Sequence, residues 1–201
     1  MGRAFLDRAR PAGPVSPMAQ NATIFKVTLE VADIDRAYYH DHALTIARHP
    51  SETDERMMVR LLAFARHAHA ALAFGRGLAT DDEPDLWRKD LTGAIDLWID
   101  VGQPDEKRIR RACGRAEAVV VYSYGGRGAD LWWEQAGAAL DRALNLTVVN
   151  LPFAATRALA KLAQRNMRVT CTIQDGQIWM ADADQSVAIE PAVLQRPPAP
   201  G

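Results

Sequence analysis

Two aspartates have the residue type and spacing of a divalent-cation site. Asp85 follows a proline, and fourteen residues separate it from Asp100, which lies in a segment that alternates apolar and polar side chains. Carboxylates on neighbouring strands can jointly hold a hard cation, because Mg²⁺ is usually bound by one or two carboxylates, waters and substrate phosphates. The pair therefore predicts a Mg²⁺ or Mn²⁺ site suited to phosphodiester hydrolysis. A solvated acidic turn without a ligand is the alternative.

Glu55 is a third candidate carboxylate. It precedes Met58, Val59 and Leu62 by three, four and seven residues, so on a helix it lies on or beside the apolar face. A carboxylate that points inward there would serve as an additional metal ligand or orient a water. The alternative is that Glu55 only complements the positive N-terminus of its helix.

Two polar residues after the acidic strand are candidates for assisting groups. Gln103 can orient a water by hydrogen bonding, and Lys107, in the first turn of the next predicted helix, can bring an ammonium towards the cation. With the three carboxylates they complete the predicted catalytic set. Asp96 shares a strand face with Asp100 but lies four residues away, roughly 13 Å at 3.3 Å per residue, so the two cannot hold one ion. Asp96 is predicted to be an edge or supporting group, or to pair with an arginine.

A basic strip follows the acidic strand. Arg108, Arg111 and Arg115 lie close to the predicted cation site in the sequence, and we expect them to contact nucleic-acid phosphates. A solvated helix face is the alternative. The glycine-rich segment 125–128 could hold an anion on its backbone amides, but it lacks GxGxxG and a Walker lysine, so a nucleotide site there is a weaker hypothesis.

The elements that must position these residues follow from periodicity, capping and turn signals. The sequence predicts an N-terminal hairpin (23–31 and 38–47), a long helix (52–74) and a strand (94–101). A helix (104–113), a strand (118–124), a helix (129–142), a strand (146–150) and a helix (152–164) follow. A second hairpin (167–173 and 177–181) and a strand (186–189) end the pattern.

The strand at 94–101 is the most informative of these elements. Its odd positions are apolar, whereas its even positions include Asp96, Trp98 and Asp100. Successive side chains of a strand point to opposite faces, so one face is apolar and the other carries carboxylates. The whole pattern predicts an α/β fold with one mixed sheet flanked by helices, parallel in the middle and with antiparallel hairpins at both ends.

Composition shifts predict a single folded domain at 18–195. Residues 1–17 carry three prolines and three arginines and lack the apolar core of a secretory signal, so we expect a disordered extension. Residues 196–201 contain three prolines and are expected to form a flexible tail.

Charge and cysteine usage exclude several protein classes. The 201 residues carry 24 Lys and Arg against 25 Asp and Glu, a net charge of −1, so a globally basic nucleic-acid binder is excluded. The two cysteines, Cys113 and Cys171, have no CxxC spacing, which indicates a reduced, cytoplasmic setting rather than a zinc cluster. No apolar run approaches the ~18 residues of a membrane span, so no membrane partner is expected.

Several segments resemble the YaeQ family of bacterial proteins. The resemblance covers essentially residues 18–194 and is carried by the runs ATIFK at 22–26, HPSETDERMM at 49–58, TDDEPDLW at 80–87, DVGQP at 100–104 and CTIQDG at 171–176. It implies a variant of the PD-(D/E)XK restriction-endonuclease-like fold, without an established activity for the family.

Carried over residue by residue, the resemblance places the PD element on Pro84-Asp85 and the second acidic position on Asp100. The lysine position falls on Gly102, a departure that leaves Gln103 or Lys107 to substitute. Glu55 resembles the extra helix carboxylate of some of these nucleases. The expectation is a metal-dependent nuclease. The alternative is a catalytically inactive member of the fold that binds nucleic acid or a protein partner.

Overall fold

The structure, a computed structural model, describes residues 22–75 and 83–198. Its strands form two mixed sheets. The five-stranded sheet has the order β10-β9-β8-β1-β2, which are Ser186–Ile189, Gln177–Ala181, Asn166–Gln174, Thr23–Asp33 and Tyr38–Arg48. The six-stranded sheet has the order β11-β7-β6-β5-β4-β3, which are Ala192–Gln195, Leu146–Asn150, Ala116–Ser123, Ile95–Val101, Leu86–Lys89 and Leu72–Phe74.

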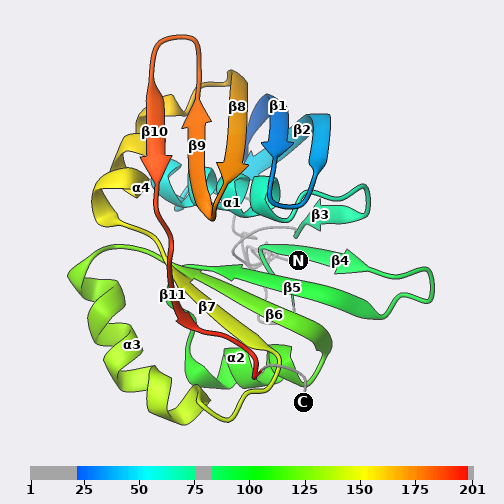
Figure 1. Ribbon diagram of the computed structural model, residues 1–201, viewed down its shortest axis with the longest axis vertical. Helices are drawn as coiled ribbons and strands as arrows, with labels where there is room; N and C mark the ends of the chain where they lie inside the picture. The colour runs from blue at the N-terminus through cyan, green and yellow to red at the C-terminus, as the bar shows by residue number, and fades with distance from the viewer. Residues whose placement is uncertain (1–21, 76–82, 199–201) are drawn as a thin grey trace, which may run out of the picture.

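The helices and sheets alternate in layers (Figure 1). Helices α1 (Asp54–Arg66) and α4 (Phe153–Leu159), the latter continued by a 3₁₀ turn (Ala160–Leu162), pack between the two sheets. Helices α2 (Glu106–Cys113) and α3 (Arg127–Leu140) cover the other face of the six-stranded sheet. Strands β5, β6 and β7 are parallel and are connected through α2 and α3. Their carboxyl ends therefore meet at one edge, where ligands of open α/β sheets commonly bind.

The prediction of an α/β fold is confirmed, but the prediction of one mixed sheet is wrong. The terminal hairpins pair with each other, because β1 and β8 run parallel with Val27 opposite Met167 and Leu29 opposite Val169. Both strands bury alternate side chains on one face. Joining them creates a second apolar surface that packs against α1, instead of extending the first sheet at its two edges.

The predicted long helix is too long. Thr53 accepts a hydrogen bond from the amide of Arg56 and begins α1. The helix ends at Arg66, and the amide of His67 bonds to the carbonyls of Ala63 and Phe64. The following residues form a turn and then β3, a three-residue edge strand. No glycine or proline marks this helix end, so the sequence gives no stop signal before residue 75.

The alternation predicted for β5 is confirmed and explains its place in the fold. Leu97, Ile99 and Val101 face the core between the sheets, whereas Trp98 faces the core under α2 and α3. Because β5 is covered on both faces, a carboxylate within it is buried unless it lies near an end of the strand. Asp100 lies near the carboxyl end of β5 and is still only 2% exposed.

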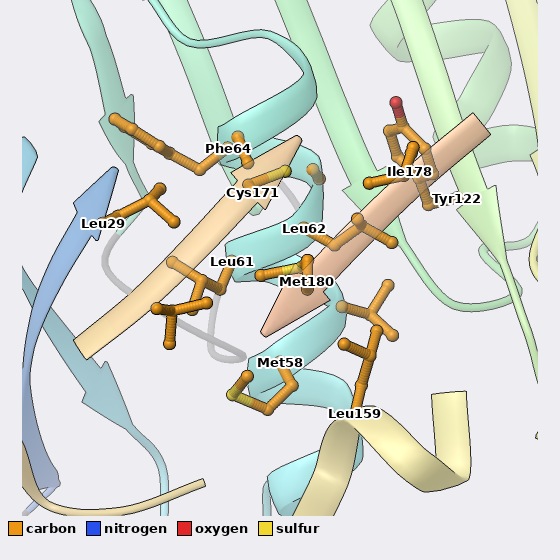
Figure 2. Close-up of a cluster of buried hydrophobic side chains, with 14 of the residues drawn as sticks. Leu29, Met58, Leu61, Leu62, Phe64, Tyr122, Leu159, Cys171, Ile178 and Met180 are labelled. Carbon is orange, nitrogen blue, oxygen red and sulfur yellow. The ribbon is translucent and has the colours of Figure 1, made fainter. Parts of the chain in front are cut away.

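The core between the sheets is built on α1. Figure 2 shows Met58, Leu61 and Leu62 of α1 beside Ile178 and Met180 of β9, and all five side chains are fully buried. This packing fixes the position of α1 against the five-stranded sheet. It thereby fixes the polar residues in the first turns of α1. Within the described residues, no helix has the length and apolar character needed to cross a membrane.

A histidine at the end of α1 should make the stability of the fold pH-dependent. His67 Nε2 lies 2.8 Å from the hydroxyl of Tyr122, and burial lowers the pKa of His67 to about 3. The unfolded chain takes up a proton below pH 6.5 while the folded protein does not. Stability is therefore lost as the pH falls through 6.5, by about 2 kcal/mol at pH 5.

The measurement is urea unfolding at pH 8 and pH 5 with wild type and His67→Gln, which keeps a side chain able to bond Tyr122. The variant should lose about 2 kcal/mol less than the wild type between the two pH values. Equal losses in the two proteins would show that His67 takes up its proton in the folded state as well.

Candidate functional site

The predicted acidic pair comes together where α1 begins and β5 ends. Asp85 immediately precedes β4 and accepts a hydrogen bond from the backbone N–H of Val101, at 2.7 Å from Oδ2. Asp100 lies within β5, one residue before Val101, and its negative charge contributes to raising the pKa of Asp85. Both carboxylates are buried, with 6% of Asp85 and 2% of Asp100 exposed.

Arg56 of α1 is the main partner of Asp85. Its Nη2 lies 2.7 Å from Oδ1 and 2.9 Å from Oδ2 of Asp85, and the same nitrogen donates to the carbonyl of Val101 at 3.4 Å. Burial raises the pKa of Asp85, and the Arg56 guanidinium opposes that rise. Burial also works against the charge of Arg56, but Asp85 and Glu52 raise its pKa overall.

Arg108 of α2 is the main partner of Asp100. It donates from Nη2 to Oδ1 at 2.7 Å and from Nε to Oδ2 at 3.1 Å, the two-pronged geometry of a strong Arg–carboxylate pair. The indole N–H of Trp98 donates to Oδ2 at 3.0 Å. Arg108 also donates to the carbonyl of Glu83 at 2.8 Å, so it ties α2 to the loop before β4.

A carboxylate and two arginines that the sequence predictions omitted complete the network. Glu52 accepts from Arg56 at 3.0 Å and from Arg60 at 2.8 Å, and Arg60 also donates to the carbonyl of Ala47. Glu52, Arg56 and Arg60 are spaced four residues apart, which is the ion-pair spacing of a helix, although Glu52 itself precedes Thr53, the N-cap of α1. This spacing could have indicated the ion pairs from the sequence. It could not have indicated that the ion pairs are buried.

These contacts decide how well the acidic pair suits a divalent cation. Both oxygens of Asp85 and both oxygens of Asp100 accept N–H groups, and a guanidinium lies against each carboxylate. No group of three or more His, Cys, Asp or Glu side chains in residues 22–75 and 83–198 is arranged to hold a metal. A cation between the two aspartates would meet both guanidiniums, so the residues as arranged here do not fit Mg²⁺ or Mn²⁺.

Glu55 follows Glu52 by three residues and lies in the first turn of α1, but it faces α4. Its Oε1 accepts from the hydroxyl of Thr156 at 2.7 Å, and Oε2 lies 3.6 Å from Nη1 of Arg157. Burial raises the pKa of Tyr124 to about 12, and the charges of Glu55, Glu52 and Asp85 act in the same direction. Tyr124 therefore stands near all three carboxylates, but the contacts of Glu55 are with α4 and not with the aspartates.

The structure also places the predicted assisting groups. Gly102, at the expected lysine position, has φ +108° and open space where a side chain would lie, and its amide bonds to the carbonyl of Tyr122. Gln103 donates to the carbonyl of Tyr124 at 2.5 Å and is exposed. Lys107 is exposed on the first turn of α2. Within the part of the chain that the structure describes, neither side chain bonds to Asp85 or Asp100.

The cations of the predicted basic strip face two different directions in the structure. Arg108 points to Asp100, whereas Lys107, Arg110, Arg111 and Arg115 are exposed. Arg110 pairs with Glu106 at 2.6 Å, and the guanidinium of Arg115 lies over the buried ring of Trp98. Asp96 lies 3.4 Å from Nε of Arg88, so of the roles predicted for it the structure shows the pairing with an arginine.

Comparisons with known proteins agree over nearly the whole described chain. The family model described as YaeQ protein matches residues 18–191. The chain is 45% identical over 180 residues to "Uncharacterized protein YaeQ" of Salmonella typhi, covering 90% of this chain and 99% of the relative. It is 44% identical to the protein of the same description from Escherichia coli (strain K12), with the same coverage.

Solved structures show the same fold. The crystal structure of YaeQ protein from Xanthomonas axonopodis pv. citri superposes with a TM-score of 0.85 at 53% identity, covering 88% of this chain and 99% of that chain. The crystal structure of YaeQ protein from Pseudomonas syringae has a TM-score of 0.84 at 36% identity, with coverages of 87% and 97%. At these identities the likeness extends beyond the arrangement of strands to the course of the whole chain.

Proposed function

This chain belongs to the YaeQ family, and we propose that it binds nucleic acid through the exposed cations of α2 and does not cleave phosphodiesters at its acidic pair. The observation that carries the proposal is the division of charge around α2. The guanidiniums that face inward neutralise Asp85 and Asp100. The cations that face outward remain at the surface.

The exposed cations define the binding surface, which we call the α2 strip: Lys107, Arg110, Arg111 and Arg115. Residues 106–115 contain these four cations, the inward-facing Arg108 and a single acid, although the whole chain has a net charge of −1. A local excess of this kind attracts the phosphate backbone through counterion release, without base recognition. Arg108 supports the strip indirectly, because its bonds to Asp100 and to the Glu83 carbonyl hold α2 against β5.

The internal ion pairs argue against hydrolysis at this site. A catalytic carboxylate must present oxygens to a cation or to the attacking water. Here those oxygens accept hydrogen bonds from Arg56, Arg108, Trp98 and the Val101 amide. The PD-(D/E)XK resemblance leads one to expect a lysine at position 102, but the residue there is Gly102, which has no cationic side chain. The acids are better understood as counterions that anchor α1, α2 and the loop before β4.

A metal-dependent phosphodiesterase of divergent PD-(D/E)XK type is the second candidate. One observation favours it: two buried carboxylates lie close enough for the charge of Asp100 to raise the pKa of Asp85. Like charges brought together in a protein interior often mark a functional site. To act as a phosphodiesterase with a bound metal, the protein would have to move both guanidiniums away from the aspartates and turn Glu55 away from Thr156.

The test measures binding and cleavage together. Fluorescence anisotropy of labelled single-stranded DNA, duplex DNA and RNA should show binding that weakens steeply with salt. Changing Arg111 and Arg115 to alanine together should lower affinity and reduce the slope of log K against log salt by about 1–2, because one or two phosphate contacts are lost. Arg168→Ala, an exposed arginine on β8, is the control and should change neither.

The same samples with Mn²⁺ separate the two candidates. We expect intact nucleic acid after incubation with the wild-type protein. Cleavage that disappears in Asp100→Asn while the variant remains folded would overturn the proposal in favour of the phosphodiesterase. Binding that is equal in wild type and in the double arginine variant would remove the α2 strip from the interface. Absence of binding to every nucleic acid would favour a protein partner.

A further inference from the structure

A cavity of about 300 Å³ lies far from the acidic pair, at the opposite end of α1. It is lined by the end of α1, by β6 and β7, and by β11 with the residues that follow it. Its polar side chains are those of Arg66, His67, Tyr122, Thr147 and Arg196. A volume of this size is at the small end of the range for ligand pockets.

Arg66 is the unusual member of this lining. Its Nη1 is buried and has no hydrogen-bond partner, and among the described residues its side chain makes no hydrogen bond or ion pair. Arg48 and Arg60 also have a buried Nε without a partner, but their guanidiniums pair with Asp54 and Glu52. A buried charged donor without a partner is costly. An anion in the cavity would remove that cost.

The charges around the cavity favour an anion as the occupant. Arg66, Arg36 and Arg88 all help to hold His67 in its neutral form. Arg36 has Asp33 as its counterion, and Arg88 has Asp96. Arg66 alone among these three lacks one in the described chain. Arg196, which also lines the cavity, adds a further cation at its exposed side.

The remaining wall is apolar and limits the shape of the occupant. Val120, Val149 and Val193 line the cavity on β6, β7 and β11, and the first two belong to the core between the sheets. A planar guanidinium matches a carboxylate with two parallel hydrogen bonds. We propose that this cavity binds a small organic carboxylate with a short aliphatic chain, its carboxylate on Arg66 and its chain against the valines.

The experiment uses the full chain and defined probes. Isothermal titration calorimetry with sodium butyrate and sodium hexanoate should give saturable binding, with 1-hexanol and inorganic phosphate as comparison probes. Arg66→Gln should weaken hexanoate binding at least about tenfold, because a charge-assisted bidentate contact is lost. Arg168→Gln makes the same change in charge on an exposed strand position and should leave the affinity unchanged.

A second variant tests the cavity without changing its charge. Val193→Trp should fill the space and abolish hexanoate binding even if Arg66→Gln fails to fold. The proposal is overturned if no carboxylate binds, if hexanoate binds equally to wild type and Arg66→Gln or Val193→Trp, or if hexanol binds as tightly as hexanoate. Binding of phosphate without binding of hexanoate would also overturn it, because the apolar wall would then contribute nothing.

Discussion

Replacing Glu52 by glutamine should lower the free energy of unfolding by about 3–5 kcal/mol at pH 7, the loss typical of breaking a buried ion pair from one side. Glu52 is 5% exposed, and its carboxylate holds Arg60 at 2.8 Å and Arg56 at 3.0 Å. Arg60 is only 1% exposed, so glutamine leaves its charge in the interior without a counterion. Urea unfolding followed by circular dichroism measures the loss.

Asp54→Asn is the matched control two residues further along the chain, in the first turn of α1. Asp54 also pairs with an arginine, Arg48, but nearly half of its side chain is exposed, and exposed ion pairs contribute about 0–1 kcal/mol. We expect a loss within that range. Losses of equal size in the Glu52 and Asp54 variants would show that burial of the Glu52 network does not determine its contribution.

Local patterns in the sequence predicted most of the elements. The hairpin of β1 and β2 follows from alternation and a turn at residues 33–37, and the parallel β5-β6-β7 unit follows from strands separated by helix-length segments. The pairing of β1 with β8 could not be predicted in this way. It joins residues about 140 positions apart, and nothing local to either strand specifies which edge it meets.

The candidate site shows the same division between local and long-range information. The positions of Asp85 and Asp100 were predicted from residue type and spacing, and the structure places both at the end of β5. Their partners Arg56 and Arg108 come from α1 and α2, so the charge state of the site depends on tertiary packing. An acidic motif in a sequence predicts where carboxylates meet, but the neutralising cations must be found in the folded chain.

Arg56→Met provides the second large effect and tests whether the Asp85 pair is structural. Removing the guanidinium leaves the carboxylate of Asp85 buried, and among the described residues the Val101 amide is its one remaining hydrogen-bond partner, so the free energy of unfolding should fall by about 3–5 kcal/mol at pH 7. Adding Asp85→Asn should restore about 2 kcal/mol, since the amide oxygen can still accept from Val101 and no unpaired charge remains at position 85.

The pH dependence of Arg56→Met follows from the same charge. Without Arg56, the effect of burial on Asp85 is opposed less, by the Val101 amide and the charge of Arg60, and the folded-state pKa lies further above 3.8. The folded variant then holds a proton that the unfolded chain releases, so its penalty is full above the folded-state pKa and disappears as the pH falls below 3.8. Urea unfolding at pH 7 and at pH 4 should show the stability difference from wild type shrinking at the lower pH. A difference that stays constant, together with no recovery in the double variant, would mean that Arg56 stabilises the protein by packing alone and that Asp85 is held in place by other contacts.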